Sequence, residues 1–333
     1  MSVSMLPAVP VPADGARGGL NFDRTVPRQL VHRASVQEVF LTDGVHVGAD
    51  RYLVGAQLPR HHALYRPDVS GRCDFMLLAE TVRQAGIFVI HRYRNVPLNH
   101  HFVFRSLALR IDDPAALRVG ATPLGAVLDV SVTQTRAPDA RRFDARLDVT
   151  IEVDGRPCAY ASVAVLVVDA RRYGMLRRRA GRDTAPADTS SPSAEISQTA
   201  SPATRISRTA SQPALTAPVI AGRPRADVLL RASADGDPST WLLHLDPGHP
   251  GYFEHPSDHV PGMVLLEAFR QAGHLAAGRD TVLTSLNSEF ESFAELCQPV
   301  TIKAADRRAG MLHLTAVQGE RTLARAEAVF TGA

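Results

Sequence analysis

The chain carries one helix-forming segment twice. Residues 76–86 recur 187 positions later as residues 263–273, and the two copies share Met, Leu, Glu, Arg, Gln, Ala and Gly at matched positions. Upstream of the two copies, three more pairs match at the same offset: Leu58 with Leu245, His62 with His249 and Tyr65 with Tyr252. Packing alone requires a core helix to repeat its apolar residues, but not its Glu, Arg and Gln. The repeat therefore indicates a duplicated domain.

Hydrophobic periodicity predicts the order of elements in the first half. We expect strands at 36–42 and 51–58, joined by a turn at residues 43–44. A helix from about residue 73 to 94 and four further strands follow. The last two of these strands flank residues 154–155, an Asp-Gly pair that is typical of a hairpin.

The second half repeats this order. Its helix is expected from residue 263 to about 277, and its last two strands turn at residues 318–319. Two strands, a long helix and four strands are the order of the hot-dog fold, whose domains pair so that their sheets join. The sequence thus predicts an α+β protein: a double hot-dog in which two long helices, wrapped by antiparallel sheets, form an intramolecular pseudo-dimer.

Composition divides the chain into four segments. Residues 1–27 are expected to be a flexible N-terminal tail, and residues 28–176 hot-dog domain 1. Residues 177–224 are rich in Ser, Thr, Ala and Pro and poor in large apolar side chains, which predicts a disordered linker. Residues 225–333 form hot-dog domain 2.

Bulk composition excludes several classes of function. The formal net charge is only +3 and the arginines are interleaved with Asp and Glu, so we expect no nucleic-acid partner. Cys73, Cys158 and Cys297 are too far apart for a metal cluster or a disulfide framework, which favours a reducing cytoplasm. No apolar run approaches the ~18 residues of a membrane span. We therefore predict a cytoplasmic protein without a membrane partner, a metal or a cofactor.

Glu267 and Arg270 are unusual on an apolar helix, because burying an unpaired charge is costly. In one interpretation Glu267 pairs with Arg270 one turn on, as Glu80 pairs with Arg83, and the pairs only tie helix to sheet. In the other, the apolar surroundings make the carboxylate a stronger proton acceptor, and the arginine is ready for an anion. The position after a histidine-rich loop favours the second interpretation.

The loops before the two helices hold the other candidate residues. His62 and Tyr65 precede the first helix, and His255 and His259 precede the second. Such histidines can cap a loop, donate to a thioester oxygen or transfer a proton. Gly262 follows a proline at the start of the second helix and leaves a bare backbone N–H, which the helix dipole makes a candidate oxyanion donor.

Two family resemblances rest on these residues. The run from His255 through Gly262 to Glu267 resembles the signature of hot-dog β-hydroxyacyl-acyl carrier protein dehydratases, with a shorter spacing. The closer resemblance is to the A-factor biosynthesis family, the AfsA-type γ-butyrolactone synthases. Residues 253–272 are similar to its second motif, and His32 with residues 80–84 resembles its first half.

The AfsA resemblance implies a reaction. An acyltransferase of this kind passes a β-ketoacyl group from an acyl carrier protein or coenzyme A thioester to the hydroxyl of dihydroxyacetone phosphate. The ester then closes to a butenolide phosphate, or to a furan phosphate in related pathways, as the precursor of a γ-butyrolactone-type signalling molecule. No cofactor is implied.

The same resemblance implies roles for the residues. Glu267 would take the hydroxyl proton, Arg270 would hold the phosphate and Gly262 would bind the thioester oxyanion. The first half lacks the Pro-Gly entry, so we expect one principal site at Glu267 and Arg270. Glu80 and Arg83 would form a second site, support the structure or bind substrate phosphate, and these alternatives stay open.

Further candidate substrate-binding residues come from the loops. His62 or Tyr65 would reach across to the site from the first half, while His255 and His259 would line the helix entry in the second. Two other functions remain open: a hot-dog β-hydroxyacyl thioester dehydratase or thioesterase, and a non-catalytic acyl-ligand binder. The sequence also leaves open an oligomer beyond the internal pseudo-dimer.

Overall fold

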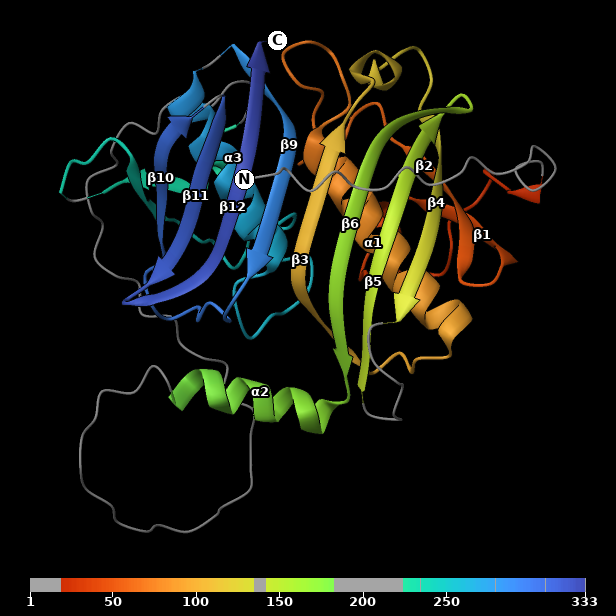
Figure 1. Cartoon of the computed structure of the whole chain (residues 1–333), viewed down its shortest axis with the longest axis horizontal. Helices are drawn as coiled ribbons and strands as arrows, with labels where there is room; N and C mark the ends of the chain where they lie inside the picture. Colours follow the sequence, from red (N-terminus) through yellow and green to blue (C-terminus); the bar gives the residue numbers. More distant parts are fainter. Residues whose placement is uncertain are drawn as a thin grey trace.

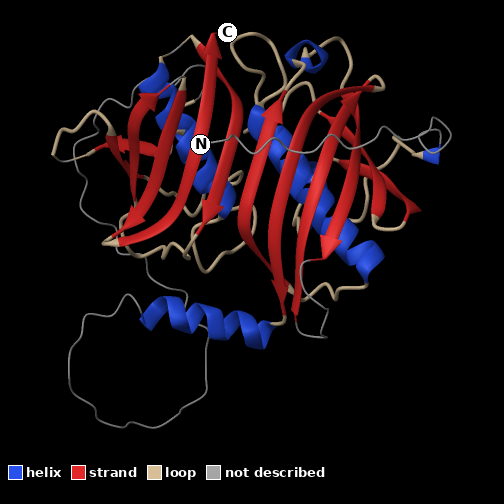
Figure 2. Cartoon of the chain, viewed as in Figure 1, coloured by secondary structure: helices blue, strands red, loops and turns tan. Residues whose placement is uncertain are grey.

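The computed structural model describes residues 19–134, 142–182 and 224–332, except 234, 279 and 309. Within these residues the strands form one antiparallel sheet of twelve strands, and both long helices lie behind it in Figure 1. Figure 2 shows the same division into a sheet layer and a helix layer. The predicted double hot-dog of α+β class is confirmed.

Each half contributes six strands and one long helix. The first half comprises β1 (Leu41–Gly48), β2 (Arg51–Leu58), α1 (Phe75–Arg94), β3 (His101–Ile111), β4 (Leu124–Gln134), β5 (Arg142–Val153) and β6 (Arg156–Val168). The second comprises β7 (Leu230–Ala232), β8 (Thr240–Leu243), α3 (Gly262–Ala277), β9 (Thr281–Phe290), β10 (Thr301–Arg308), β11 (Met311–Gln318) and β12 (Arg321–Gly332). A further helix, α2 (Ala170–Arg182), follows β6.

The strand order shows the internal two-fold symmetry. It runs β1-β2-β4-β5-β6-β3-β9-β12-β11-β10-β8-β7, so the second half repeats the first in reverse from the seam between β3 and β9. At that seam Leu107 faces Ser288, and the Ser288 hydroxyl donates to the Leu107 carbonyl at 2.8 Å. The two halves therefore share one sheet, and their helices lie on the same side of it.

The repeated glutamines fasten each helix to the segment before the first strand pair of its half. The Gln84 side chain accepts from the Phe40 N–H at 3.0 Å and donates to the Glu38 carbonyl at 2.7 Å. Gln271 accepts from the Leu229 N–H at 2.8 Å and donates to the Asp227 carbonyl at 2.9 Å. Both glutamines are fully buried, where an unpaired amide would be costly. Their recurrence in the sequence is thus structural.

The first strand pair differs from the prediction. Residues 36–38 form a short 3-10 helix, η3 (Val36–Glu38), and β1 begins only at Leu41. The predicted turn at residues 43–44 lies inside β1, and the chain reverses at Ala49, whose φ is +44°. Gly44 serves packing instead, because a Cβ there would lie 2.4 Å from the Phe88 ring.

Two predicted domain boundaries also need correction. The tail was expected to end at residue 27, but Val26 is buried and its N–H donates to the Leu41 carbonyl at 3.0 Å. The linker was expected from residue 177, but α2 continues to Arg182 because Tyr173 and Arg177 anchor it to the second half. Residues 1–18 and 183–223 lie outside the described residues.

Two negative findings concern the described part of the chain only. It holds no helix long and apolar enough to cross a membrane. It also holds no cluster of three or more His, Cys, Asp or Glu side chains arranged to bind a metal ion.

Candidate functional site

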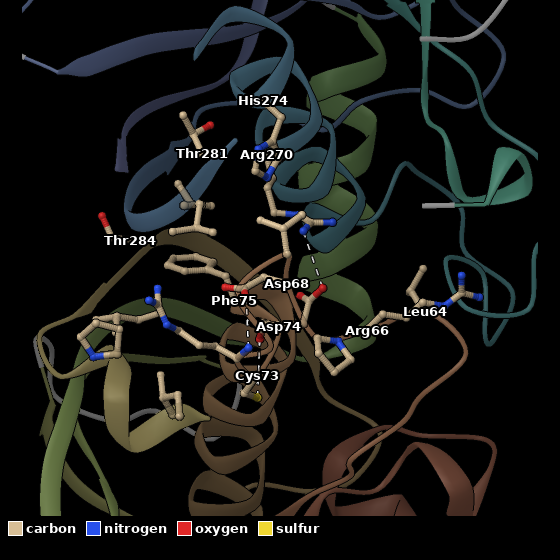
Figure 3. A pocket seen from close by; sticks show the side chains of 18 of the residues that line it. Leu64, Arg66, Asp68, Cys73, Asp74, Phe75, Arg270, His274, Thr281 and Thr284 are labelled. Atoms are coloured by element: carbon tan, nitrogen blue, oxygen red, sulfur yellow. Dashed lines mark hydrogen bonds and ion pairs between the residues drawn. The ribbon is translucent and has the colours of Figure 1, made fainter. Parts of the chain in front are cut away.

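Two cavities lie where the halves meet, and the internal symmetry relates them. Each lies at the N-terminus of one long helix and is lined by the repeated arginine of the other. The interdomain cavity, of about 580 Å³, is lined by Gly262 of α3 and Arg83 of α1. The Asp74 pocket, of about 180 Å³, is lined by Asp74 at the start of α1 and Arg270 of α3 (Figure 3).

The Asp74 pocket already contains its own anion. The Asp74 carboxylate caps α1 by accepting from the Met76 N–H at 2.7 Å, and its other oxygen lies 3.6 Å from an Arg270 nitrogen. The Asp74 side chain is only 4% exposed. Burial also raises the pKa of the neighbouring Cys73 thiol, which makes it a poor nucleophile. Arg270 in this pocket therefore already has two carboxylate partners within the chain, Asp74 and Glu267.

The interdomain cavity has no carboxylate at the corresponding helix start, although Glu254 and Glu267 line it elsewhere. Pro261 takes the position of Asp74 in the repeat and gives α3 no side-chain cap. Gly262 and Met263, in the first turn of α3, line the cavity together with Arg83. First-turn N–H groups and the helix dipole attract negative charge. By symmetry with Asp74, an anion between α3 and Arg83 would contact both.

The buried carboxylate of Glu80 pairs with two arginines that line this cavity, Arg83 and Arg33. Its carboxylate accepts from Arg83 at 2.7 and 2.8 Å and from Gln84 at 2.8 Å, and it also pairs with Arg33. Burial alone would raise the pKa of Glu80, but Arg33 and Arg83 outweigh it and hold the pKa at about 2. Arg33 and Arg83 line the cavity, whereas Glu80 is fully buried beneath them.

Glu267 and Arg270 form the ion pair that their spacing suggests. Arg270 donates to the two Glu267 oxygens at 2.9 and 2.8 Å, and Gln271 donates at 2.7 Å. Burial alone would lower the pKa of Arg270, but the carboxylates of Glu267 and Asp74 outweigh it. The net effect raises the pKa, so the guanidinium stays charged. Glu267 lines the interdomain cavity, whereas Arg270 lines the Asp74 pocket. The structure thus places Arg270 apart from Gly262.

His259 forms a dyad with the preceding residue at the cavity wall. Its Nδ1 lies 2.7 Å from an Asp258 oxygen that also accepts from the Tyr173 hydroxyl at 2.7 Å. The hydrogen bond with His259 holds the pKa of Asp258 well below its usual range. An ionised carboxylate only accepts, so Nδ1 of His259 carries the proton. In the neutral ring, Nε2 then keeps a free lone pair.

His32 belongs to a second histidine arrangement in this cavity. His91 Nδ1 lies 2.8 Å from the Val96 carbonyl, so it donates, and His91 Nε2 accepts from His32 Nε2 at 2.8 Å. Burial, His91 and Arg83 lower the pKa of His32 to about 3. His32 is therefore neutral near pH 7 and keeps its lone pair on Nδ1.

The remaining predicted residues are divided between loop and cavity. His62 is buried, and its ring accepts from the Tyr65 N–H at 3.2 Å and lies 3.2 Å from Glu38, so it holds its own loop and does not reach across. Tyr65 does line the cavity and stacks on His62. His255 also lines it from an exposed loop position.

Among the cavity residues that were not predicted are Arg33, His101 and Tyr173. Arg33 follows the short helix η2 (Arg28–Val31), and Tyr173 comes from α2, so neither belongs to the repeat. The Tyr173 ring stacks on His101 with centroids 4.0 Å apart, and all three line the cavity. Arg33 directly follows His32, which the family resemblance includes, and this adjacency is the signal that the sequence offers for it.

Comparisons with known proteins identify the family of this chain. The sequence matches the family model for the AfsA A-factor biosynthesis hotdog domain over residues 17–169 and 213–332. The chain belongs to the AfsA family. A relative from Streptomyces virginiae, named 2-oxo-3-(phosphooxy)propyl 3-oxoalkanoate synthase, is 35% identical over 90% of this chain and 95% of its own length. A synthase of the same name from Streptomyces coelicolor is 32% identical over 88% and 86%.

Solved structures give looser matches. An acyl-ACP thioesterase from Bacteroides thetaiotaomicron is 12% identical, with a TM-score of 0.47 over 84% of this chain and 98% of that chain. The 12:0-ACP thioesterase from Umbellularia californica is 9% identical, with a TM-score of 0.49 over 87% and 100%. The family match and the curated relatives confirm the AfsA resemblance and the synthase class that the sequence predicts.

Proposed function

We propose that this AfsA-family chain joins a β-ketoacyl group, delivered as a thioester on acyl carrier protein or coenzyme A, to the hydroxyl of dihydroxyacetone phosphate. The product is the ester in its relatives' name, 2-oxo-3-(phosphooxy)propyl 3-oxoalkanoate. This ester closes to a butenolide phosphate by an intramolecular aldol condensation with loss of water. The observation that carries the proposal is the interdomain cavity, where an uncapped helix N-terminus and Arg83 face one space.

The transfer makes four demands on the site. The acceptor hydroxyl oxygen attacks the thioester carbonyl carbon, so a C–O bond forms, the C–S bond breaks, and the sulfur leaves as a thiol. The hydroxyl proton needs an acceptor, and the carbonyl oxygen needs donors as its negative charge develops. The phosphate needs a cation, and the acyl chain needs an apolar wall.

The start of α3 suits the carbonyl oxygen. The Gly262 and Met263 N–H groups belong to the first turn of α3, which has no side-chain cap, and both residues line the cavity. Donors fixed in a helix need no reorganisation when charge develops on the oxygen. The predicted role of Gly262 as oxyanion donor is therefore part of this proposal.

Arg83 and Arg33 suit the phosphate better than Arg270. Both line the cavity and share the carboxylate of Glu80, and Arg33 also lies 3.8 Å from Glu254. Each guanidinium has more N–H donors than these acceptors use, so donors remain for a further anion. Arg270 lies in the other pocket between Glu267 and Asp74. We assign the substrate phosphate to Arg83 and Arg33, and Arg270 to support of the helix pair.

His259 suits the proton acceptor. Asp258 holds the Nδ1 proton, which leaves Nε2 to take the hydroxyl proton, and the ring lines the cavity. The Glu267 oxygens already accept from Arg270 and Gln271. The role of Glu267 as base therefore stays a prediction. Because its oxygens already accept these hydrogen bonds, we favour a role for Glu267 in positioning α3.

The acyl chain requires the apolar side of the cavity. Ile87 of α1 and Phe102 and Phe104 of β3 supply apolar surface to the cavity. Phe104 also lies against Phe290 of β9, with ring centroids 6.3 Å apart, across the seam between the halves. The acyl chain would therefore contact both halves of the chain.

The direct test is incubation of the protein with a 3-oxoacyl thioester and dihydroxyacetone phosphate. We expect release of free thiol that depends on the acceptor, together with a phosphorylated ester or butenolide. Thiol release without the acceptor would indicate a thioesterase, and exchange between hydroxyacyl and enoyl forms would indicate a dehydratase. Binding of the acyl group without any turnover would indicate a non-catalytic binder. Each of these three results would overturn the proposal.

A further inference from the structure

Helix α2 presents two different faces. Its sequence, Ala170–Arg182, contains six arginines and no acidic residue. With about 3.6 residues per turn, Tyr173 and Arg177 lie on one side of the helix. Arg171, Met175 and Arg178 lie on the opposite side, and all three are exposed. The helix therefore has an inner and an outer face.

The inner face is fixed to the second half of the chain. Arg177 donates to both Glu295 oxygens at 2.7 and 2.8 Å, and its guanidinium lies 4.9 Å from the centre of the Phe293 ring. Tyr173 donates to Asp258 and lines the interdomain cavity. The helix is thus held beside the loop that carries His259, at the wall of the proposed active site. In Figure 1 it lies across the lower end of both halves.

The outer face combines positive charge with one apolar side chain. Arg171, Arg178 and Arg179 are exposed, and no ion pair joins them to an acidic group among the described residues. Met175 lies between them and is 43% exposed, one of few large apolar side chains so exposed in the described chain. A cationic rim around a flexible apolar centre fits an acidic helical surface.

We propose that this outer face of α2, formed by Arg171, Met175, Arg178 and Arg179, docks the acidic helix of an acyl carrier protein that delivers the thioester. The inference rests on the proposed function and selects the carrier protein over coenzyme A as donor. A carrier docked there lies one helix width, about 10 Å, from the cavity wall formed by Tyr173. Its thioester arm then enters beside His259, which shares Asp258 with Tyr173.

Charge and shape together favour this partner over the alternatives. Coenzyme A would engage the arginines through its phosphates but would leave Met175 without a contact. A nucleic acid would make phosphate contacts without a need for access to the cavity. A carrier protein uses the arginines, the methionine and the adjacent cavity at once. Its encounter with α2 would also be steered by charge, and so would weaken with salt.

The test compares two donors with the same 3-oxoacyl group: a bacterial fatty-acid acyl carrier protein and the small N-acetylcysteamine thioester. The variant carries Arg171→Glu and Arg178→Glu on the outer face. The control carries Arg118→Glu and Arg156→Glu, at two exposed arginines. One end of the β3–β6 pair lies beside α2, because His101 contacts Tyr173 there, and both control arginines lie beyond the opposite end. Both variants reverse two charges, so they change net charge equally.

We expect the outer-face variant to raise the KM for the acylated carrier protein at least tenfold, with kcat on the small thioester within twofold of wild type. The control should keep both values. Fluorescence anisotropy with labelled carrier protein measures docking directly, so it reports even if no transfer to dihydroxyacetone phosphate is found. Unchanged carrier binding and KM in the outer-face variant would overturn the inference. An equal loss with both donors would do so too, because it would assign α2 to the cavity itself.

Discussion

Asp74, at the N-terminus of α1, lies 3.6 Å from Arg270 of α3, and so places a carboxylate where the other half of the chain has an open cavity. Its counterpart in the repeat is Pro261, which cannot supply an anion. The two helix starts are thus equivalent positions of the repeat, but only one of them carries a carboxylate. One is closed by its own carboxylate, and the other is open toward Arg83.

Pro261→Asp should convert the open site toward the closed one. The new carboxylate would cap α3 and meet Arg83, as Asp74 caps α1 and meets Arg270. We expect activity to fall by at least tenfold, because the new carboxylate would occupy the anion position. The melting temperature should hold or rise, because an Asp cap stabilises a helix by about 1 kcal/mol relative to a residue without a capping side chain. Steady-state kinetics and thermal melting measure the two effects. Wild-type activity in this variant would count against an anion at this position.

Asp74→Ala should have the reverse profile. It removes the cap of α1 and one partner of Arg270, so we expect a loss of about 1–2 kcal/mol in the free energy of unfolding. Transfer activity should stay within about threefold, because the Asp74 pocket is assigned no chemistry. Denaturant unfolding and the transfer assay test this. A complete loss of activity in a folded Asp74→Ala protein would indicate that the Asp74 pocket takes part in the chemistry, and would contradict the assignment of the active site to the interdomain cavity.

Much of the fold follows from the repeat in the sequence, but the assignment of its repeated residues does not. The helices, the four strands after each and the two late hairpins all follow from periodicity and turn residues. Gln84 and Gln271 repeat because each satisfies the same buried backbone groups. A repeat alone does not distinguish such structural residues from catalytic ones.

The site depends on relationships that a single strand of sequence does not display. Each repeated arginine lines the cavity at the start of the other long helix. Arg83 of α1 therefore shares a cavity with Gly262 of α3, and Arg270 of α3 shares one with Asp74. Arg33 and Tyr173 come from segments outside the repeat, and α2 begins just before residues that read as a linker. Long-range pairing, which periodicity does not encode, brings these segments to the cavity.

Glu80→Gln should test the buried arginine support. Removing one partner of a buried ion pair costs about 3–5 kcal/mol, since Arg33 and Arg83 would lose their shared carboxylate. The pKa of Glu80 is lowered from 4.5 to about 2, so its contribution is present above pH 4.5 and is lost as pH falls toward 2. Urea unfolding at several pH values should show a smaller acid-induced loss in Glu80→Gln than in wild type. Equal pH profiles would refute the coupling.

The repeated glycines offer a matched pair. A Cβ on Gly273 would lie 2.2 Å from the Phe330 ring, whereas a Cβ on Gly86 would lie 3.5 Å from Leu147. We expect Gly273→Ala to destabilise the protein by about 1–3 kcal/mol through overpacking. Gly86→Ala should be neutral or stabilise it by up to about 1 kcal/mol through helix propensity. Thermal melts of both variants decide this, and equal effects would contradict the packing.

His259→Asn tests the proposed proton acceptor. Asn keeps polarity but offers no ring nitrogen to take the hydroxyl proton, so we expect kcat to fall about 10²–10⁴-fold with little change in donor KM. Asp258→Asn should give a smaller loss, because His259 would lose the acceptor that orients its ring. The control is Glu267→Gln. A larger loss of kcat there than in His259→Asn would return the role of base to Glu267.

The central claim is that the interdomain cavity at Arg83, rather than the pocket at Arg270, binds the phosphorylated acceptor. Its most direct test is the KM for dihydroxyacetone phosphate in Arg83→Gln and Arg270→Gln, two substitutions at matched positions of the repeat. We predict at least a tenfold rise for Arg83→Gln, from the loss of a charge-assisted phosphate contact worth about 1.5–3 kcal/mol, and less than a threefold rise for Arg270→Gln. A selective rise in Arg270→Gln, with Arg83→Gln unchanged, would contradict the account.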